Sequence, residues 1–207
     1  MSTRPRRLLL PLALAAVLLL AGSSASQAVN ISLQPPYNVV NAVGVAPAGP
    51  QQFTAGGIQF ACTPTVTFRV NVPAVAGAVI GNLIPMLHIT AVNFAACPAG
   101  VVMASLNNAA NPIIVGQLTA TTPGGPGTVL FVALNVRVRV TLGAAMQCLF
   151  TGSMGIRILA NGTVLLLGGN LVSTPIPAQG DTCLAGIVAV LGPTTYTPAP
   201  PLFANVI

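Results

Sequence analysis

The chain has 207 residues, of which 54% are hydrophobic and 4% are charged, and its seven Lys or Arg residues face a single Asp or Glu. A hydrolase with paired carboxylates is excluded, because that chemistry needs two acidic side chains. Nucleic-acid binding is also excluded. Three of the seven cations lie within the first seven residues, and the other four are too scattered to neutralise a phosphate backbone.

The first 28 residues have the features of a secretory signal peptide. Three arginines precede an apolar run at 8–21, and small residues follow that run. The run is shorter than the roughly 20 residues that a membrane-spanning helix needs. We therefore predict a secreted, extracellular protein without a stable membrane span, cleaved after Ala28 or, as a second choice, after Ala25.

The rest of the chain has the length of one domain with a real core. We expect a single β domain over residues 29–195 and a Pro-rich, apolar C-terminal tail over 196–207. Phe203, Val206 and Ile207 make the tail apolar enough to seek a partner. The tail is expected either to add a strand to a neighbouring sheet edge or to fold back on its own domain.

Short runs of alternating or β-branched residues follow one another along this domain, separated by Gly, Pro and Asn clusters. The runs that predict strands are 57–72, 86–97, 128–142, 155–160, 163–169 and 184–192. Asn161-Gly162 predicts a hairpin with a type I′ turn, because both central residues of that turn need positive φ. Helical periodicity and capping signals are nearly absent. The sequence predicts an all-β fold, an antiparallel sandwich or barrel.

Four arginines remain after the signal peptide, each between two large apolar residues: Arg69, Arg137, Arg139 and Arg157. Because neighbouring side chains in a strand point to opposite faces, all four are expected on the outer face, with water as their partner. There they would oppose edge-to-edge association with other chains. The alternative is a small patch for an anionic polymer or lipid head group, formed if Arg137 and Arg139 lie beside Arg69 or Arg157.

Four cysteines form two pairs with equal separations of 35 residues: Cys62 and Cys97, Cys148 and Cys183. In an exported chain, four cysteines indicate two disulfides. A zinc site is disfavoured because no C-x-x-C pair is present. Of the three possible pairings we favour Cys62 with Cys97 and Cys148 with Cys183, and we expect neither a metal nor a cofactor.

Four segments carry a resemblance to a known family: "FACTPTVTFRV", "LHITAVNFAAC", "CLFTGSMGIRILANGTVLLLGG" and "CLAGIVAVLGPTTYTP". Their rhythm of Cys, Gly and Thr resembles that of the secreted β-rich surface proteins typified by the alkane-oxidation activator (PraB-type) family, over most of residues 50–198. The resemblance implies an exported, mainly β protein without an established catalytic site. It further implies a link to growth on hydrophobic substrates and to surface or biofilm behaviour.

A catalytic triad has few candidates: His88, Asp181 and a serine such as Ser153, whose T-G-S-M-G setting only approximates a nucleophile elbow. We expect His88 on a strand with a satisfied ring nitrogen, and Asp181 in a turn that it stabilises through its own backbone. The sequence therefore predicts a non-catalytic structural or adhesive protein of the cell surface that self-associates. The alternative is a barrel that carries an apolar small molecule or lipid.

Overall fold

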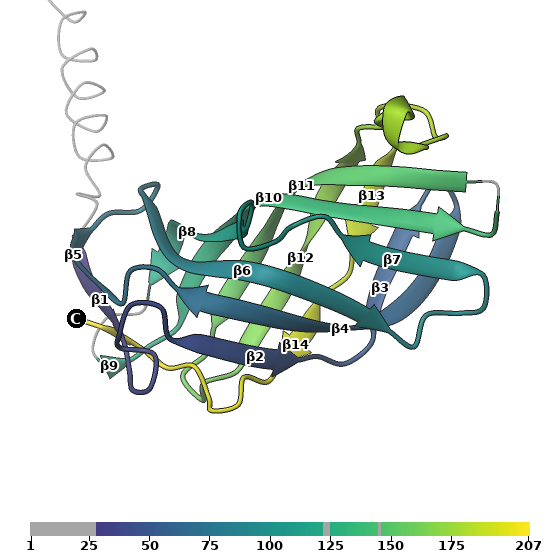
Figure 1. The fold of residues 1–207 in the computed structure, drawn as a ribbon. Helices are drawn as coiled ribbons and strands as arrows, with labels where there is room; N and C mark the ends of the chain where they lie inside the picture. The colour runs from purple at the N-terminus through teal and green to yellow at the C-terminus, as the bar shows by residue number, and fades with distance from the viewer. Residues whose placement is uncertain (1–27, 122–124, 145) are drawn as a thin grey trace, which may run out of the picture.

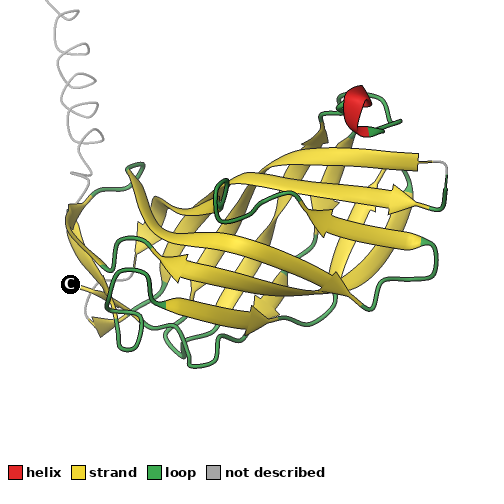
Figure 2. Ribbon diagram, in the orientation of Figure 1, coloured by secondary structure: helices red, strands yellow, loops and turns green. Residues whose placement is uncertain are grey.

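The computed structural model of the chain describes residues 28–121, 125–144 and 146–207. Almost the whole predicted signal peptide therefore lies outside the described residues. Figure 1 and Figure 2 show a molecule built of strands, with a single 3-10 turn η1 (Pro177–Gln179) and no α-helix in the described part. The predicted all-β class is confirmed.

Eleven antiparallel strands form the main sheet. They are β2 (Val43–Pro47), β3 (Gln51–Ala55), β4 (Ile58–Val70), β6 (Leu83–Ala95), β7 (Val101–Ser105), β8 (Ile113–Thr121), β10 (Val129–Leu142), β11 (Met146–Ile158), β12 (Val164–Ser173), β13 (Val188–Leu191) and β14 (Thr194–Tyr196). Nine of them follow the order β11-β10-β8-β6-β4-β3-β13-β12-β14, while β2 pairs with β4 and β7 with β10. β11 also pairs with β12. The sheet thus closes on itself, so that opposite strands pack face to face around one core.

Alternation of side chains along the strands builds this core. In β4, every second residue from Phe60 to Val70 is buried, while the residues between them are partly exposed. β10 shows the same pattern, in which Val136, Val138 and Val140 point inward. Phe and Val at the inward positions, and Thr at several positions between them in β4, suit a pleated surface that is covered on one side. The two-residue period read from the sequence is therefore the period of burial.

The C-terminal segment folds back on its own chain. Tyr196 ends β14 and pairs with Val164, so the first residue of the predicted tail belongs to the main sheet. A second, four-stranded sheet lies at one end of the molecule in the order β5 (Ala74–Ala78), β1 (Val29–Leu33), β15 (Ala204–Val206) and β9 (Gly125–Pro126). Val206, one of the apolar residues of the predicted tail, is fully buried opposite Ile31, as in the fold-back alternative.

The hairpin at Asn161-Gly162 joins β11 to β12 as predicted, but its turn type differs. Leu159 and Thr163 face each other, with the Leu159 N–H donating to the Thr163 carbonyl at 2.9 Å. The Gly162 N–H donates back to the Leu159 carbonyl at 2.9 Å, and of the two turn residues only Gly162 has positive φ. These features describe a three-residue loop with a glycine bulge. The Asn161 side chain accepts a bond from the Thr163 N–H instead of adopting the left-handed backbone of a type I′ turn.

The long predicted strands match β4, β6, β10 and β12 closely, whereas 155–160 is only the final part of β11. Nine further strands were not predicted: β1, β2, β3, β5, β7, β8, β9, β14 and β15. Most of these are only three to five residues long. Strands this short carry too little alternation of their own, and their partners in the sheet define them.

Both predicted disulfides are present: Cys62 with Cys97 and Cys148 with Cys183. Cys62 is buried on β4, and Cys97 follows the end of the neighbouring strand β6. Cys148 is buried on β11, and its partner Cys183 lies in the loop after η1. The first disulfide therefore ties two paired strands together, and the second fastens a long loop to the barrel.

Candidate functional site

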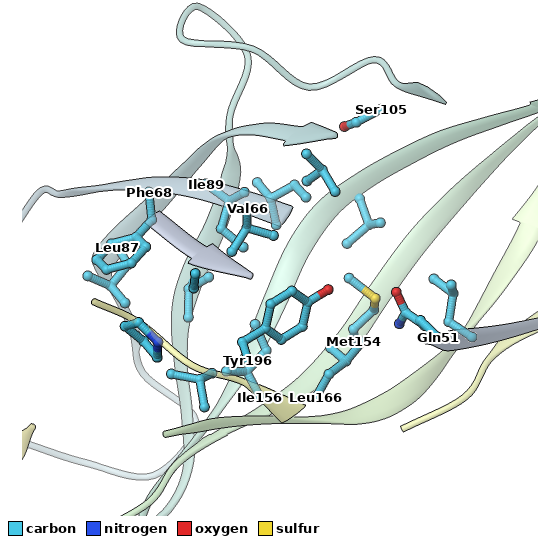
Figure 3. Close-up of a pocket in the computed structure, with 18 of the residues that line it drawn as sticks. Gln51, Val66, Phe68, Leu87, Ile89, Ser105, Met154, Ile156, Leu166 and Tyr196 are labelled. Atoms are coloured by element: carbon cyan, nitrogen blue, oxygen red, sulfur yellow. The ribbon is translucent and has the colours of Figure 1, made fainter. Parts of the chain in front are cut away.

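A cavity lies inside one half of the barrel. The centre of a water molecule can occupy about 70 Å³ within it. A single water requires only roughly 10–15 Å³ on this measure. Its wall consists mainly of inward aliphatic side chains from opposite strands, including Val66, Leu87, Ile89, Met154, Ile156 and Leu166 (Figure 3). The cavity thus results from inward side chains that do not meet across the barrel.

Three polar side chains interrupt this apolar wall: Gln51, Ser105 and Tyr196. Tyr196 is only 8% exposed, and Figure 3 shows its hydroxyl pointing into the cavity toward Met154 and Gln51. Burial raises the pKa of Tyr196 above its ordinary value. The phenol is therefore neutral at any ordinary pH and keeps its proton for donation.

Gln51 is 4% exposed, and its Nε2 donates to the Gly192 carbonyl at 3.3 Å. Ser105 is bonded within its own loop, because its Oγ accepts from the Asn107 N–H at 3.1 Å. Tyr196 and Gln51 lie on strands close to each other, since Ala48, three residues before Gln51, forms a bridge with Tyr196. One end of the cavity therefore carries two polar groups in an otherwise hydrocarbon environment.

A second cavity of about 110 Å³ on the same measure lies further along the barrel. Gln51 of β3 lines the first cavity, and Phe53, the next inward residue, lines the second. Phe53 stacks on Phe60 at a centroid distance of 5.0 Å and meets Phe150 edge-on at 5.3 Å. All three rings line the second cavity, and only the first cavity has polar side chains in its wall.

All four arginines lie on the outer face of the barrel, as predicted, but the strand register does not bring them together. Arg157 of β11 is opposite Leu130 of β10, and Leu130 lies seven residues before Arg137. The separation between Arg157 and Arg137 along the strands is therefore roughly 23 Å at about 3.3 Å per residue. Arg69 pairs with His88 of β6, His88 with Ile114 of β8, and Ile114 with Leu134 of β10. Arg69 is therefore three strands away from Leu134, or roughly 14 Å at about 4.8 Å per strand. Arg137 and Arg139 therefore lie beside neither Arg69 nor Arg157, which an anion-binding patch would require.

Arg139 has a protein partner, which corrects the expectation that water is the partner of every arginine. Its Nε lies 3.1 Å from Oδ1 of Asp181, and its Nη2 donates to Oε1 of Gln179 at 2.7 Å. The Asp181 carboxylate also accepts from the Ile176 N–H at 2.8 Å and from the Gln147 amide. Burial raises the pKa of Asp181, but these hydrogen bonds and the Arg139 charge outweigh it and hold the pKa below its ordinary value.

We expect Arg139→Thr to lower the free energy of unfolding by about 1–3 kcal/mol more than Arg137→Thr does, because it leaves the buried Asp181 carboxylate without its cation. Threonine retains β propensity at both positions. The Arg139 side chain is 18% exposed, so the loss stays below that of a fully buried pair. Urea unfolding of both variants measures the difference, and equal losses would contradict a structural role for the pair.

The candidate triad residues do not form a triad. His88 lies on β6 beside Arg69 of β4, and its Nδ1 is buried without a hydrogen-bond partner among the described residues. Within the described part of the chain, Nδ1 therefore lacks the partner that we expected for a ring nitrogen of His88. Burial and the Arg69 charge lower the pKa of His88. The donors to the Asp181 carboxylate come from Arg139, Gln147 and Ile176 rather than from a histidine, and Ser153 is exposed on β11.

Within residues 28–121, 125–144 and 146–207, no three His, Cys, Asp or Glu side chains come together as metal ligands do. The same part of the chain forms no helix with the length and hydrophobicity needed to cross a membrane. The cavity combines an apolar wall with the phenol of Tyr196. Comparison with protein-family models, with curated proteins and with solved structures gives no match for this chain.

Proposed function

We propose that this chain is a secreted carrier that holds an apolar small molecule inside its barrel. The observation that carries this proposal is the cavity, whose wall is hydrocarbon except at a few points. Side chains around an empty void lack contacts on one side, so an apolar ligand that fills the void gains dispersion energy. Apolar pockets with a few convergent polar groups are the usual form of small-molecule sites.

Two features support the extracellular part of the proposal. Both disulfides are of the kind that persists in oxidising compartments. The basic and apolar leader at residues 1–28 is typical of exported proteins. The resemblance to secreted proteins linked to growth on hydrophobic substrates is consistent with an apolar cargo.

The oxidised protein is expected to bind the neutral fluorescent probe N-phenyl-1-naphthylamine saturably, with one probe in each chain. Val92→Phe should weaken this binding about tenfold, because Val92 lines the cavity and the larger ring occupies its volume. Val92 is only partly buried, so the barrel can accommodate the change. Fluorescence titration measures the affinity, and circular dichroism and the Tm verify the fold.

Ala91→Phe provides the matched control. Ala91 is the preceding residue of β6, and its register partner Thr67 lies on the outer face. The control should bind the probe as the parent does. If the parent does not bind the probe, or if both variants bind it equally well, the carrier proposal fails.

A second candidate function, a structural or adhesive component of the cell surface, rests on the outer face of β12 and β13. Val172 and Val188 are cross-strand neighbours there, and Val188 is 54% exposed, with Val190 and Leu184 exposed nearby. Such a face suits self-association or contact with a hydrophobic substrate. Size analysis combined with lipid extraction separates the two functions. A monomer with bound lipid supports the carrier, whereas a multimer without lipid supports the surface component.

A further inference from the structure

The hydroxyl of Tyr196 faces the cavity as a donor that no described residue uses. The residue as a whole is only 8% exposed, yet none of the described residues forms a hydrogen bond with this hydroxyl. The chain's other tyrosine, Tyr37, shows the usual arrangement, since its hydroxyl donates to the Pro200 carbonyl at 3.0 Å. A buried hydroxyl normally has a partner, because leaving it unsatisfied costs free energy.

Gln51 supplies the complementary group. Its Nε2 is used by the Gly192 carbonyl, which leaves Oε1 as an acceptor without a donor among the described residues. Ser105, the third polar side chain of the wall, has its Oγ engaged with Asn107. The cavity thus presents one donor, from Tyr196, and one acceptor, from Gln51, and Figure 3 shows the hydroxyl of Tyr196 pointing toward Gln51.

The charge of the wall limits the ligand further. Among the residues that line the cavity, none is Asp, Glu, Lys, Arg or His. An ionised head group would lose its hydration here without meeting a counter-charge, which is strongly unfavourable. A purely hydrocarbon ligand, in turn, would leave both the Tyr196 hydroxyl and the Gln51 carbonyl unsatisfied.

We propose that the carried molecule is a neutral aliphatic alcohol, whose hydroxyl oxygen accepts from the Tyr196 hydroxyl and whose proton is donated to Oε1 of Gln51. This inference rests on the proposed carrier function and specifies its ligand class. A ketone or ester satisfies only Tyr196, and an alkane satisfies neither group. Discrimination by two buried polar groups is effective, because a ligand that lacks the matching group leaves them unpaired.

The test is displacement of N-phenyl-1-naphthylamine from the oxidised protein by 1-octanol, 2-octanone, octane and octanoate. Octanol should bind more tightly than the ketone, the ketone more tightly than octane, and octanoate should be the weakest at neutral pH. Tyr196→Phe and Gln51→Leu should each weaken octanol binding about three- to tenfold, the loss of one hydrogen bond. Octane and the probe should bind as before, because both replacements keep the apolar volume of the wall.

The outcomes separate the two proposals. If the probe does not bind, the carrier function itself fails. If the probe binds but octanol is no better than octane, or if octanoate is preferred, the alcohol assignment is overturned while the carrier remains. If Tyr196→Phe weakens octane as much as octanol, Tyr196 acts through packing alone, and the assignment is overturned as well.

Discussion

Gly116→Ala is expected to cost at least about 3 kcal/mol of stability, through overpacking that the fold cannot relieve. Gly116 is buried on β8, directly under a register shift in the neighbouring strand β6 between Leu83 and Leu87. A Cβ at this position would overlap the carbonyl group of Ile84 and lie 2.8 Å from Cα of Pro85. These are backbone atoms, so no side-chain rotation can make room, and the β6–β8 pairing must open.

Urea unfolding followed by circular dichroism measures this loss, and Gly49→Ala is the control. A Cβ at Gly49 has no atom within 4 Å, and the backbone there is not in the left-handed region. The control should change stability by no more than about 0.5 kcal/mol, as is usual for surface replacements. A Gly116→Ala protein as stable as the control would show that β6 is not held against β8 at this point.

Removing the Cys148–Cys183 disulfide by the double replacement Cys148→Ala and Cys183→Ala is expected to cost roughly 4 kcal/mol, the chain-entropy figure for a loop of this length. The bond has a further role, because it anchors the loop that carries Asp181. In the same loop, the Thr174 N–H donates a hydrogen bond to the Leu149 carbonyl at 2.9 Å. Leu149 points to the outer face of β11 and is nevertheless 1% exposed, at the point where this loop bonds to its backbone.

The matched comparison is Cys62→Ala with Cys97→Ala, because that disulfide closes a loop of equal sequence separation. The entropy terms are therefore equal, and any difference reports what each bond holds in place. We expect the larger loss for the Cys148–Cys183 variant, together with exposure of Leu149 to an apolar dye. A loss below about 1 kcal/mol would contradict the anchoring role.

Much of the fold was predictable because it depends on local pattern. Inward and outward positions alternate in β4 and β10 as the sequence alternates, and the outward placement of all four arginines follows from the same rule. The disulfide pairing was also predicted correctly. The short strands were not, since strands such as β2 and β14 exist only because β4 and β12 lie beside them.

The candidate site could not be predicted, because its parts are distant in the chain. Gln51 begins β3, and Tyr196 ends β14, in a segment that the sequence assigned to the tail. The Arg139–Asp181 pair was missed for the same reason, since the two residues are 42 positions apart. The local sequence does not indicate that the Tyr196 hydroxyl lacks a hydrogen-bond acceptor among the described residues, because the neighbouring residues are typical of any short strand.

The sequence by itself determined the all-β class, the face on which each long strand presents its charges, and the two disulfides. These follow from two-residue periodicity, turn residues and cysteine number, which act over a few residues or through composition. Only the tertiary structure decided that the sheet closes on itself, that β15 returns to β1 and that the inward side chains leave a cavity near Gln51 and Tyr196. Periodicity specifies that a side chain points inward, but whether it meets a neighbour there depends on strands that are far apart in the chain.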